Sequence, residues 1–129
     1  MREILFRGKR LDNGEWIEGD LVHSVYKIGD TCVGKFGCTL GMHQVDHYTV
    51  GQYTGLNDKN GKRIFDGDVA KVLQGKDKDI AYVGFENGAF MLYPKTGNIY
   101  ERTLWEYWYN DWDVEVVGNI TDNPELLEK

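Results

Sequence analysis

The sequence has little cysteine and proline, and it has no long apolar run. Two of its 129 residues are cysteine and two are proline. No apolar stretch approaches the roughly 20 residues of a membrane-spanning helix. Residues Met1–Arg7 become charged after three apolar side chains, which predicts no secretory signal. Cys32 and Cys38 are therefore expected to stay reduced, and we expect a cytoplasmic protein that does not enter a membrane.

Recognisable catalytic and phosphate-binding motifs are also missing. The sequence contains neither GxGxxG nor GxxxxGK followed by Ser or Thr. No nucleophile elbow surrounds its single serine, Ser24. Asp66 and Asp68 could share one strand face and serve acid–base chemistry, although acids in such positions more often shape turns. We therefore predict a non-enzymatic protein without a cofactor.

Positive charge is sparse and scattered. The formal net charge is −6. Residues 1–65 hold 9 basic and 8 acidic side chains, whereas residues 66–129 hold 6 and 13. Proteins that follow a phosphate backbone gather Lys and Arg on one face. The distribution therefore disfavours nucleic acid as a partner, and the acidic second half favours a protein.

Glycine is abundant, with 16 residues, and it separates short apolar runs. This alternation with Gly, Asn and Asp is typical of antiparallel hairpins. We expect strands at residues 4–7, 16–22, 25–28, 31–35, 50–53, 63–65, 69–73, 80–86, 89–93 and 114–120, with a charged mobile loop at 74–79. Residues 37–47 suit no regular element. The structural turn residues are Asn13, Gly14, Gly19, Asp20, Asn60, Gly61, Gly67 and Asp68.

Two of these stretches resemble each other. Phe6-Arg7-Gly8 and the residues up to Leu21 are echoed by Tyr53-Thr54-Gly55 and the residues up to Val69, with one residue inserted. The echo is either two copies of one hairpin unit or a chance recurrence of Asn-Gly and Gly-Asp turns. In both cases we expect the two Gly-Asp segments to have the same structural role.

The richest aromatic stretch is residues 103–112. Thr103 and Glu106 form a capping-box pattern, which predicts one short helix near residues 103–111. We expect Leu104 and the tryptophans to share its apolar face. Five rings in eight residues exceed what one short helix can bury, so core packing, a protein interface and ligand stacking all remain open. The candidate interaction surface is Trp105, Trp108, Tyr109 and Trp112.

Four potential metal ligands lie within 16 residues: Cys32, Cys38, His43 and His47. Such side chains could hold zinc tetrahedrally. Their C-x5-C-x4-H-x3-H spacing differs from that of known zinc fingers. We therefore favour two thiols and two surface imidazoles over a metal site.

Four segments together resemble the YopX family of small phage and prophage proteins. The most specific is VGQYTGLNDKNGKRIFDGDV at residues 50–69, and the others are ILFRG at 4–8, GEWIEGDL at 14–21 and VGNITDNPELL at 117–127. The resemblance implies a largely β fold with an SH3-like barrel portion. It supplies no catalytic or metal residue, because the family's biochemical function is uncharacterised.

These observations lead to one expected architecture and one expected role. We predict a mainly β, β-rich α+β fold of antiparallel hairpins, with an SH3-like barrel portion and one short helix. The chain should form a single domain, 1–129, with possible sub-modules 1–45 and 46–129. We expect a phage or prophage accessory protein in the host bacterial cytoplasm that acts through protein–protein contacts as a homo-oligomer or with a phage or host protein. The alternative is a nucleic-acid-associated small β-barrel.

Overall fold

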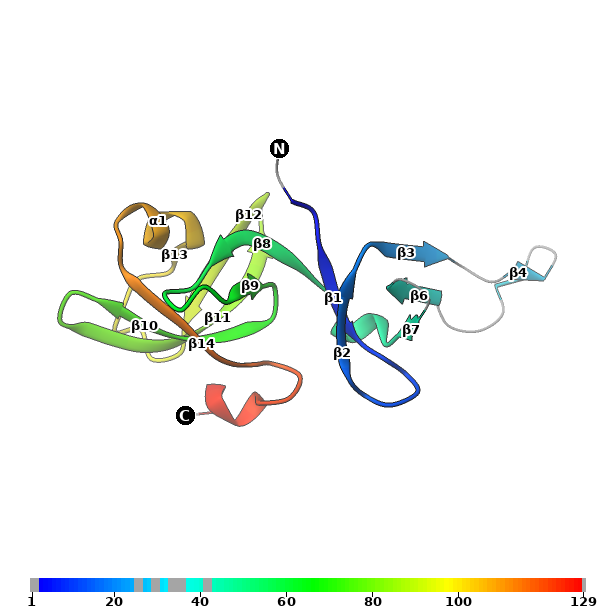
Figure 1. Cartoon of the computed structure of the whole chain (residues 1–129). Helices are drawn as coiled ribbons and strands as arrows, with labels where there is room; N and C mark the ends of the chain where they lie inside the picture. The colour runs from blue at the N-terminus through cyan, green and yellow to red at the C-terminus, as the bar shows by residue number, and fades with distance from the viewer. Residues whose placement is uncertain (1–2, 25–26, 29–30, 33–36, 41–42, 129) are drawn as a thin grey trace. The chain divides into compact units, whose positions relative to one another are not determined.

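The computed structural model describes the backbone of residues 3–24, 27–28, 31–32, 37–40 and 43–128. Side chains are described for residues 3–21, 40 and 43–128. The chain divides into two compact units, Met1–Tyr53 and Thr54–Lys129. Figure 1 labels most elements of both units, and each unit is described separately below.

The first unit contains short antiparallel strands. β1 (Phe6–Lys9) and β2 (Trp16–Gly19) form a hairpin, and β1 also pairs with the start of β8 (Gly51–Asn57). The remaining elements are β3 (Leu21–Ser24), β4 (Lys27–Ile28), β5 (Thr31–Cys32), β6 (Gly37–Leu40), β7 (His43–Val45) and the 3-10 turn η1 (His47–Thr49). β6 lies between β3 and β7, and β4 pairs with β5.

A small apolar core holds this unit together. Leu40 and Val45 are buried, and Phe6, Ile17, Leu21 and Val50 pack against them. Gly8 of β1 lies over this core, where an added Cβ would be 3.2 Å from the Val45 Cβ. A side chain at position 8 would therefore push the β7 residue out of place.

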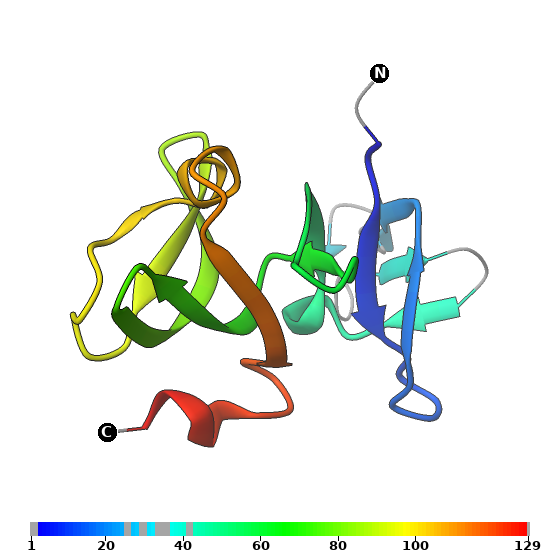
Figure 2. The same cartoon turned by 60° about the vertical axis from the view of Figure 1, so that its left-hand side comes forward.

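The second unit is built on a five-stranded antiparallel sheet with the order β13-β12-β11-β10-β14. Its elements are β9 (Arg63–Phe65), β10 (Asp68–Gln74), β11 (Asp77–Glu86), β12 (Ala89–Pro94), β13 (Arg102–Thr103), α1 (Leu104–Tyr109), β14 (Asp113–Asn119) and the 3-10 turn η2 (Pro124–Leu127). α1 packs against β12 and β13, and η2, the red C-terminal turn of Figure 2, packs against β11.

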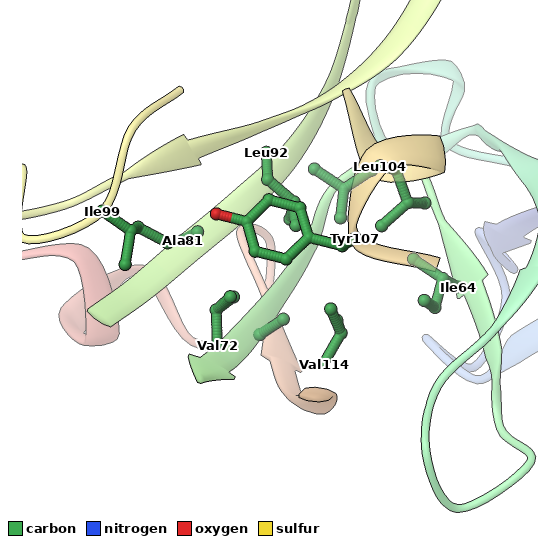
Figure 3. Close-up of a cluster of buried hydrophobic side chains, with 10 residues drawn as sticks. Ile64, Val72, Ala81, Leu92, Ile99, Leu104, Tyr107 and Val114 are labelled. Atoms are coloured by element: carbon green, nitrogen blue, oxygen red, sulfur yellow. The ribbon is translucent and has the colours of Figure 1, made fainter. Parts of the chain in front are cut away.

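The core of this unit lies between the sheet and α1. Tyr107 projects from α1 into a cluster of aliphatic side chains (Figure 3) and is fully buried. Its hydroxyl donates to the Tyr100 carbonyl oxygen at 3.5 Å. The strand residues of the cluster alternate along β10 and β11 because successive side chains point to opposite faces. The cluster consists of Ile64, Ala70, Val72, Ala81, Val83, Leu92, Ile99, Leu104, Tyr107 and Val114.

The predicted fold class is confirmed, with one correction. The chain is mainly β, its strands pair antiparallel, and its short helix begins directly after Thr103. Within residues 54–128, no strand pairing joins β13 to β14, so the sheet stays open rather than closing into the predicted barrel. The β8–β9 loop bonds to the edge strand β14, where the Lys59 amide donates to the Val114 carbonyl oxygen at 3.0 Å.

Three local predictions are wrong. Residues 74–79 form the paired ends of β10 and β11 and a tight turn rather than a loop, because Gly75 adopts φ +62° and pairing continues to Gln74 and Asp77. Residues 37–40 and 43–47 contribute to β6, β7 and η1. The two Gly-Asp segments also differ. Gly67 makes a turn with φ 93° before buried Asp68, whereas Gly19 is a β2 residue paired with Phe6.

The boundary between the two units differs from the predicted one, and the hairpin predicted at residues 25–35 is described only in part. The expected sub-modules met at residues 45 and 46, whereas the two units meet at residues 53 and 54. The expected hairpin at 25–35 is represented by the β4–β5 pair. Its predicted turn, Gly29-Asp30, lies outside the described residues.

Candidate functional site

The site is built around helix α1, which begins with a side-chain cap. The Thr103 hydroxyl accepts a hydrogen bond from the Glu106 amide at 3.3 Å and donates to the Glu106 carboxylate at 3.2 Å. Arg102 donates to the same carboxylate at 2.9 Å. These bonds, above all that from Arg102, lower the pKa of the Glu106 carboxyl. The helix start is therefore fixed by one polar cluster.

The helix ends in a left-handed turn. Asp111 has φ 56°, and its amide donates to the Trp108 carbonyl oxygen at 3.2 Å. The Trp112 amide donates to the Tyr107 carbonyl oxygen at 3.0 Å. This pair of bonds is a Schellman motif, which places its two flanking hydrophobic residues in contact. The Trp112 and Tyr107 rings lie 5.1 Å apart, edge to face, as that motif requires.

Helical periodicity leaves three large rings on the outer side of α1. Trp105, Trp108 and Tyr109 lie at positions i, i+3 and i+4, and are 55%, 60% and 68% exposed. The Trp105 and Tyr109 rings stack with their centroids 4.9 Å apart. We call these three residues the α1 aromatic face. Monomeric proteins rarely expose such a contiguous apolar area without a function for it.

The predicted apolar helix face is thereby corrected. The sequence grouped Leu104 with the tryptophans, but Leu104 and Tyr107 are the buried helix residues. Trp112 lies beyond the end of the helix and is half-buried. The structure therefore brings Trp105, Trp108 and Tyr109 together in solvent and separates Trp112 from them.

A pocket of about 230 Å³ lies beside this face, within the second unit. Its lining includes Trp108 and Trp112, the turn residue Asp111, and Asp113, the first residue of β14. The apolar side chains of Leu56, Ile64 and Leu104 also line it. The pocket therefore combines aromatic walls with carboxylates.

The three aspartates that line the pocket differ in burial and in hydrogen bonding. Asp58 is buried; its Oδ1 accepts from the amides of Asn60 and Lys62, and its Oδ2 accepts from the amide of Val116, each at 2.9 Å. Asp58 thus fixes the β8–β9 loop against β14. Asp111 and Asp113 are exposed at the pocket, so their carboxylates remain available there.

A second hollow, of about 320 Å³, lies on the outer face of the sheet. Three lysines line it: Lys71, Lys78 and Lys95. They come together around Ile80 because Lys71 pairs with Ile80 and the Lys95 amide donates to the Ile80 carbonyl oxygen at 2.7 Å. Half of the six cations in residues 66–129 thus line one hollow.

Asp66 and Asp68 do not form an accessible acidic pair. Asp68 is 1% exposed, and its Oδ2 accepts from the Phe65 amide at 2.8 Å. Asp66 and Gly67 form the turn before β10. Asp68 therefore fastens a turn inside the core.

The remaining predicted turn residues occupy loops and strand ends. Gly14 and Gly61 have φ values of 71° and 81°, in the β1–β2 and β8–β9 turns. Asn13 accepts a hydrogen bond from the Glu15 amide through its side chain at 2.9 Å. Asn60 and Asp20 are exposed.

The four proposed metal ligands are placed only in part. The side chains of Cys32 and Cys38 lie outside the described residues. His43 is exposed on β7, and the His47 ring lies 3.9 Å from that of Tyr48. Among the side chains that the structure describes, no group of three or more His, Cys, Asp or Glu could hold a metal ion.

Sequence reasoning missed the lysine hollow and the structural role of Asp58. The hollow depends on the β10–β11 register, which a tight turn at Gly75-Lys76 would have specified. Asp58 carries a recognisable signal, because Asp often accepts hydrogen bonds from amides a few residues further on. The 230 Å³ pocket carries no such signal, since Leu56, Trp108 and Asp113 meet only in the folded chain.

The fold and this site define a small antiparallel β protein with an exposed aromatic helix. The family model for the YopX protein matches residues 5–128, so the chain belongs to the YopX family.

A solved structure, that of protein EF1440 from Enterococcus faecalis, is similar in fold. It is 22% identical, has a TM-score of 0.61, and the match covers 99% of this chain and 100% of that chain. No curated protein matches the chain. None of the helices within the described residues is long and apolar enough to span a membrane.

Proposed function

We propose that this chain is a non-enzymatic phage or prophage accessory protein that works through protein–protein contacts, including contacts between copies of itself. The α1 aromatic face carries this proposal. Its three rings are each more than half exposed, and Trp and Tyr are the side chains that most often anchor protein interfaces. Burying them against a partner would remove a large apolar area from water.

The chemistry of the surroundings supports a protein rather than a small substrate. The pocket beside the face is smaller than the roughly 300–1,000 Å³ of typical ligand and cofactor pockets. The proposal includes a phage origin, which the resemblance to the YopX family implies, and a location in the cytoplasm of the bacterial host. An enzyme would need reactive groups in an accessible cleft, whereas buried Asp58 and Asp68 both hold backbone amides.

Light scattering over a concentration series tests the proposal. The chain should associate as its concentration rises, and the double variant Trp105→Ser, Tyr109→Ser should remain monomeric at the same concentrations. Tyr48→Ser is the matched control, because Tyr48 is 85% exposed but belongs to the first unit. A strict monomer at high concentration, with no protein partner recovered from infected cells, would contradict the proposal.

The lysine hollow favours a second candidate, a nucleic-acid-associated protein. Lys71, Lys78 and Lys95 could neutralise phosphates, and such binding weakens steeply with salt because counterions are released. This candidate predicts binding of a DNA or RNA oligomer at low salt that Lys71→Gln and Lys78→Gln together weaken. The absence of binding at low salt would remove it.

A further inference from the structure

The pocket beside the α1 aromatic face is small for a binding pocket. Its volume of about 230 Å³ lies below the range of ligand pockets that bury a cofactor or a drug-sized molecule. It is lined by Trp108, a residue of the α1 aromatic face that is 60% exposed, so an occupant can reach the pocket from that face. A protein docked on that face could therefore place one side chain into it.

The walls of the pocket are suited to a flat cation. Trp108 and Trp112 supply two indoles, and tryptophan is the aromatic side chain that attracts cations most strongly. Trp112 already makes a cation–π contact within the chain, because the guanidinium carbon of Arg102 lies 5.6 Å from the centroid of its ring. The same ring chemistry is available to a second guanidinium at the pocket.

The polar lining of the pocket is short of positive charge. The carboxylate of Asp58 is occupied by three backbone amides. Lys59 lines the pocket, but its ammonium pairs with Glu115 at 3.2 Å. Within the described part of the chain, no side-chain hydrogen bond or ion pair engages the carboxylates of Asp111 and Asp113. Two carboxylates beside two indoles therefore lack a cation.

Arginine suits this combination better than lysine does. Its planar guanidinium can stack on an indole while its N–H groups donate to carboxylate oxygens in a fixed fork. The ammonium of lysine is a strongly hydrated point charge that would gain less from the ring face. The excess of 13 acidic over 6 basic residues in 66–129 also attracts a basic segment.

We propose that the pocket binds an arginine side chain of a partner protein, with the guanidinium held between Trp108, Trp112 and the carboxylates of Asp111 and Asp113. This inference rests on the proposed function, since it supposes that a protein docks on the α1 aromatic face. It adds the chemistry of the anchor: the partner segment carries an arginine that enters an acidic, indole-lined pocket.

A short arginine peptide tests this directly. The full chain is labelled with 5-fluorotryptophan, which gives one ¹⁹F signal for each of its four tryptophans. Acetyl-Gly-Arg-Gly-amide is added, and the same peptide with citrulline in place of arginine serves as the neutral control. We expect saturable shifts at Trp108 and Trp112, with weak affinity because a tripeptide buries little surface. Trp16 should not shift, because Arg7 and Lys9 already lie 4.8 Å and 5.6 Å from its ring centroid.

The variants identify the groups that bind. Asp111→Asn with Asp113→Asn should weaken arginine-peptide binding by about tenfold or more, because it removes both charges. Asn also tolerates the left-handed conformation at position 111, so the fold is kept. Glu101→Gln with Glu125→Gln is the matched control, since it also removes two exposed negative charges and neither residue lines the pocket. Its binding should equal that of the unaltered chain.

Three results would overturn the pocket assignment. They are equal binding of the citrulline peptide, unchanged binding by the Asn double variant, and shifts at Trp105 alone. The light-scattering series distinguishes a failure of the arginine pocket from a failure of the proposed function. Self-association without arginine-peptide binding removes only the arginine pocket. Arginine-peptide binding by a strictly monomeric chain supports the pocket and counts against self-assembly.

Discussion

At the scale of single residues, Asp111 occupies a position that favours glycine. Its φ of 56° lies in the left-handed region, where a Cβ costs energy that glycine does not incur. The Schellman bonds of the Trp108 and Tyr107 carbonyls require this conformation. An aspartate therefore occupies a position at the helix end that is unfavourable for its backbone, and it lines the pocket.

Replacing Asp111 with glycine should raise stability and weaken arginine-peptide binding. The expected gain is about 1 kcal/mol or less in the free energy of unfolding, since glycine relieves the left-handed strain but adds freedom to the unfolded chain. Chemical denaturation measures it. Asp113→Gly is the control and should not stabilise, because Asp113 belongs to strand β14, where glycine is unfavourable. A destabilised Asp111→Gly variant would contradict the account of the turn.

The residue scale also shows why some roles cannot be read from sequence. Asp58 and Asp68 resemble the other acids of the second half, yet both are buried and accept backbone hydrogen bonds. Gly84 shows the same limit. An added Cβ would lie 2.6 Å from the Tyr93 ring, whose hydroxyl donates to Glu86 at 2.6 Å. The contact between position 84 and the Tyr93 ring depends on the register of β11 and β12, and the presence of a glycine in the sequence does not reveal that register.

At the scale of elements, α1 depends on the polar cluster at its start. Arg102 and Thr103 bond to Glu106, and these bonds lower the pKa of its carboxyl below the ordinary value of 4.5. A lowered pKa in the folded state adds stability that is fully present above the unfolded pKa. That stability is lost as the pH falls through the folded value.

The variant Glu106→Gln should therefore lower Tm near neutral pH and have a smaller effect at about pH 2, because the stability that this charge adds is lost as the pH falls through the lowered pKa of the folded state. Thermal unfolding by circular dichroism across this range measures the difference. Glu101→Gln, at an exposed position next to the same helix, corrects for the general loss of one negative charge. An equal Tm decrease at both pH values would show that charge at Glu106 contributes nothing.

Elements with local signals were predicted well, and those with distant partners were not. The β1–β2 hairpin follows from Asn13-Gly14, and the helix start follows from Thr103 and Glu106. β6 pairs with β7, which follows it, and also with β3, 13 to 19 residues earlier, and the pairing with β3 leaves no signal in the residues around β6. The exposed side of α1 was also mispredicted, because the Schellman turn, not the helical period, positions Trp112.

At the scale of the whole molecule, the family and fold class followed from the sequence, whereas the surfaces did not. The resemblance seen in the residues 50–69 block is confirmed by the family match over residues 5–128. The open sheet and both hollows depend on which strands meet across the fold. The charge of the second unit is also distributed unevenly, because its acidic, aromatic pocket is separate from its lysine hollow.

The central claim is that the α1 aromatic face is a contact surface between copies of this chain. Dilution of the 5-fluorotryptophan-labelled protein, followed by ¹⁹F spectroscopy, tests it most directly, because Trp105 and Trp108 lie on the face and Trp16 does not. We predict that the Trp105 and Trp108 signals shift together with concentration while the Trp16 signal stays fixed. Signals that are constant at every concentration, or that move only at Trp16, would contradict the claim.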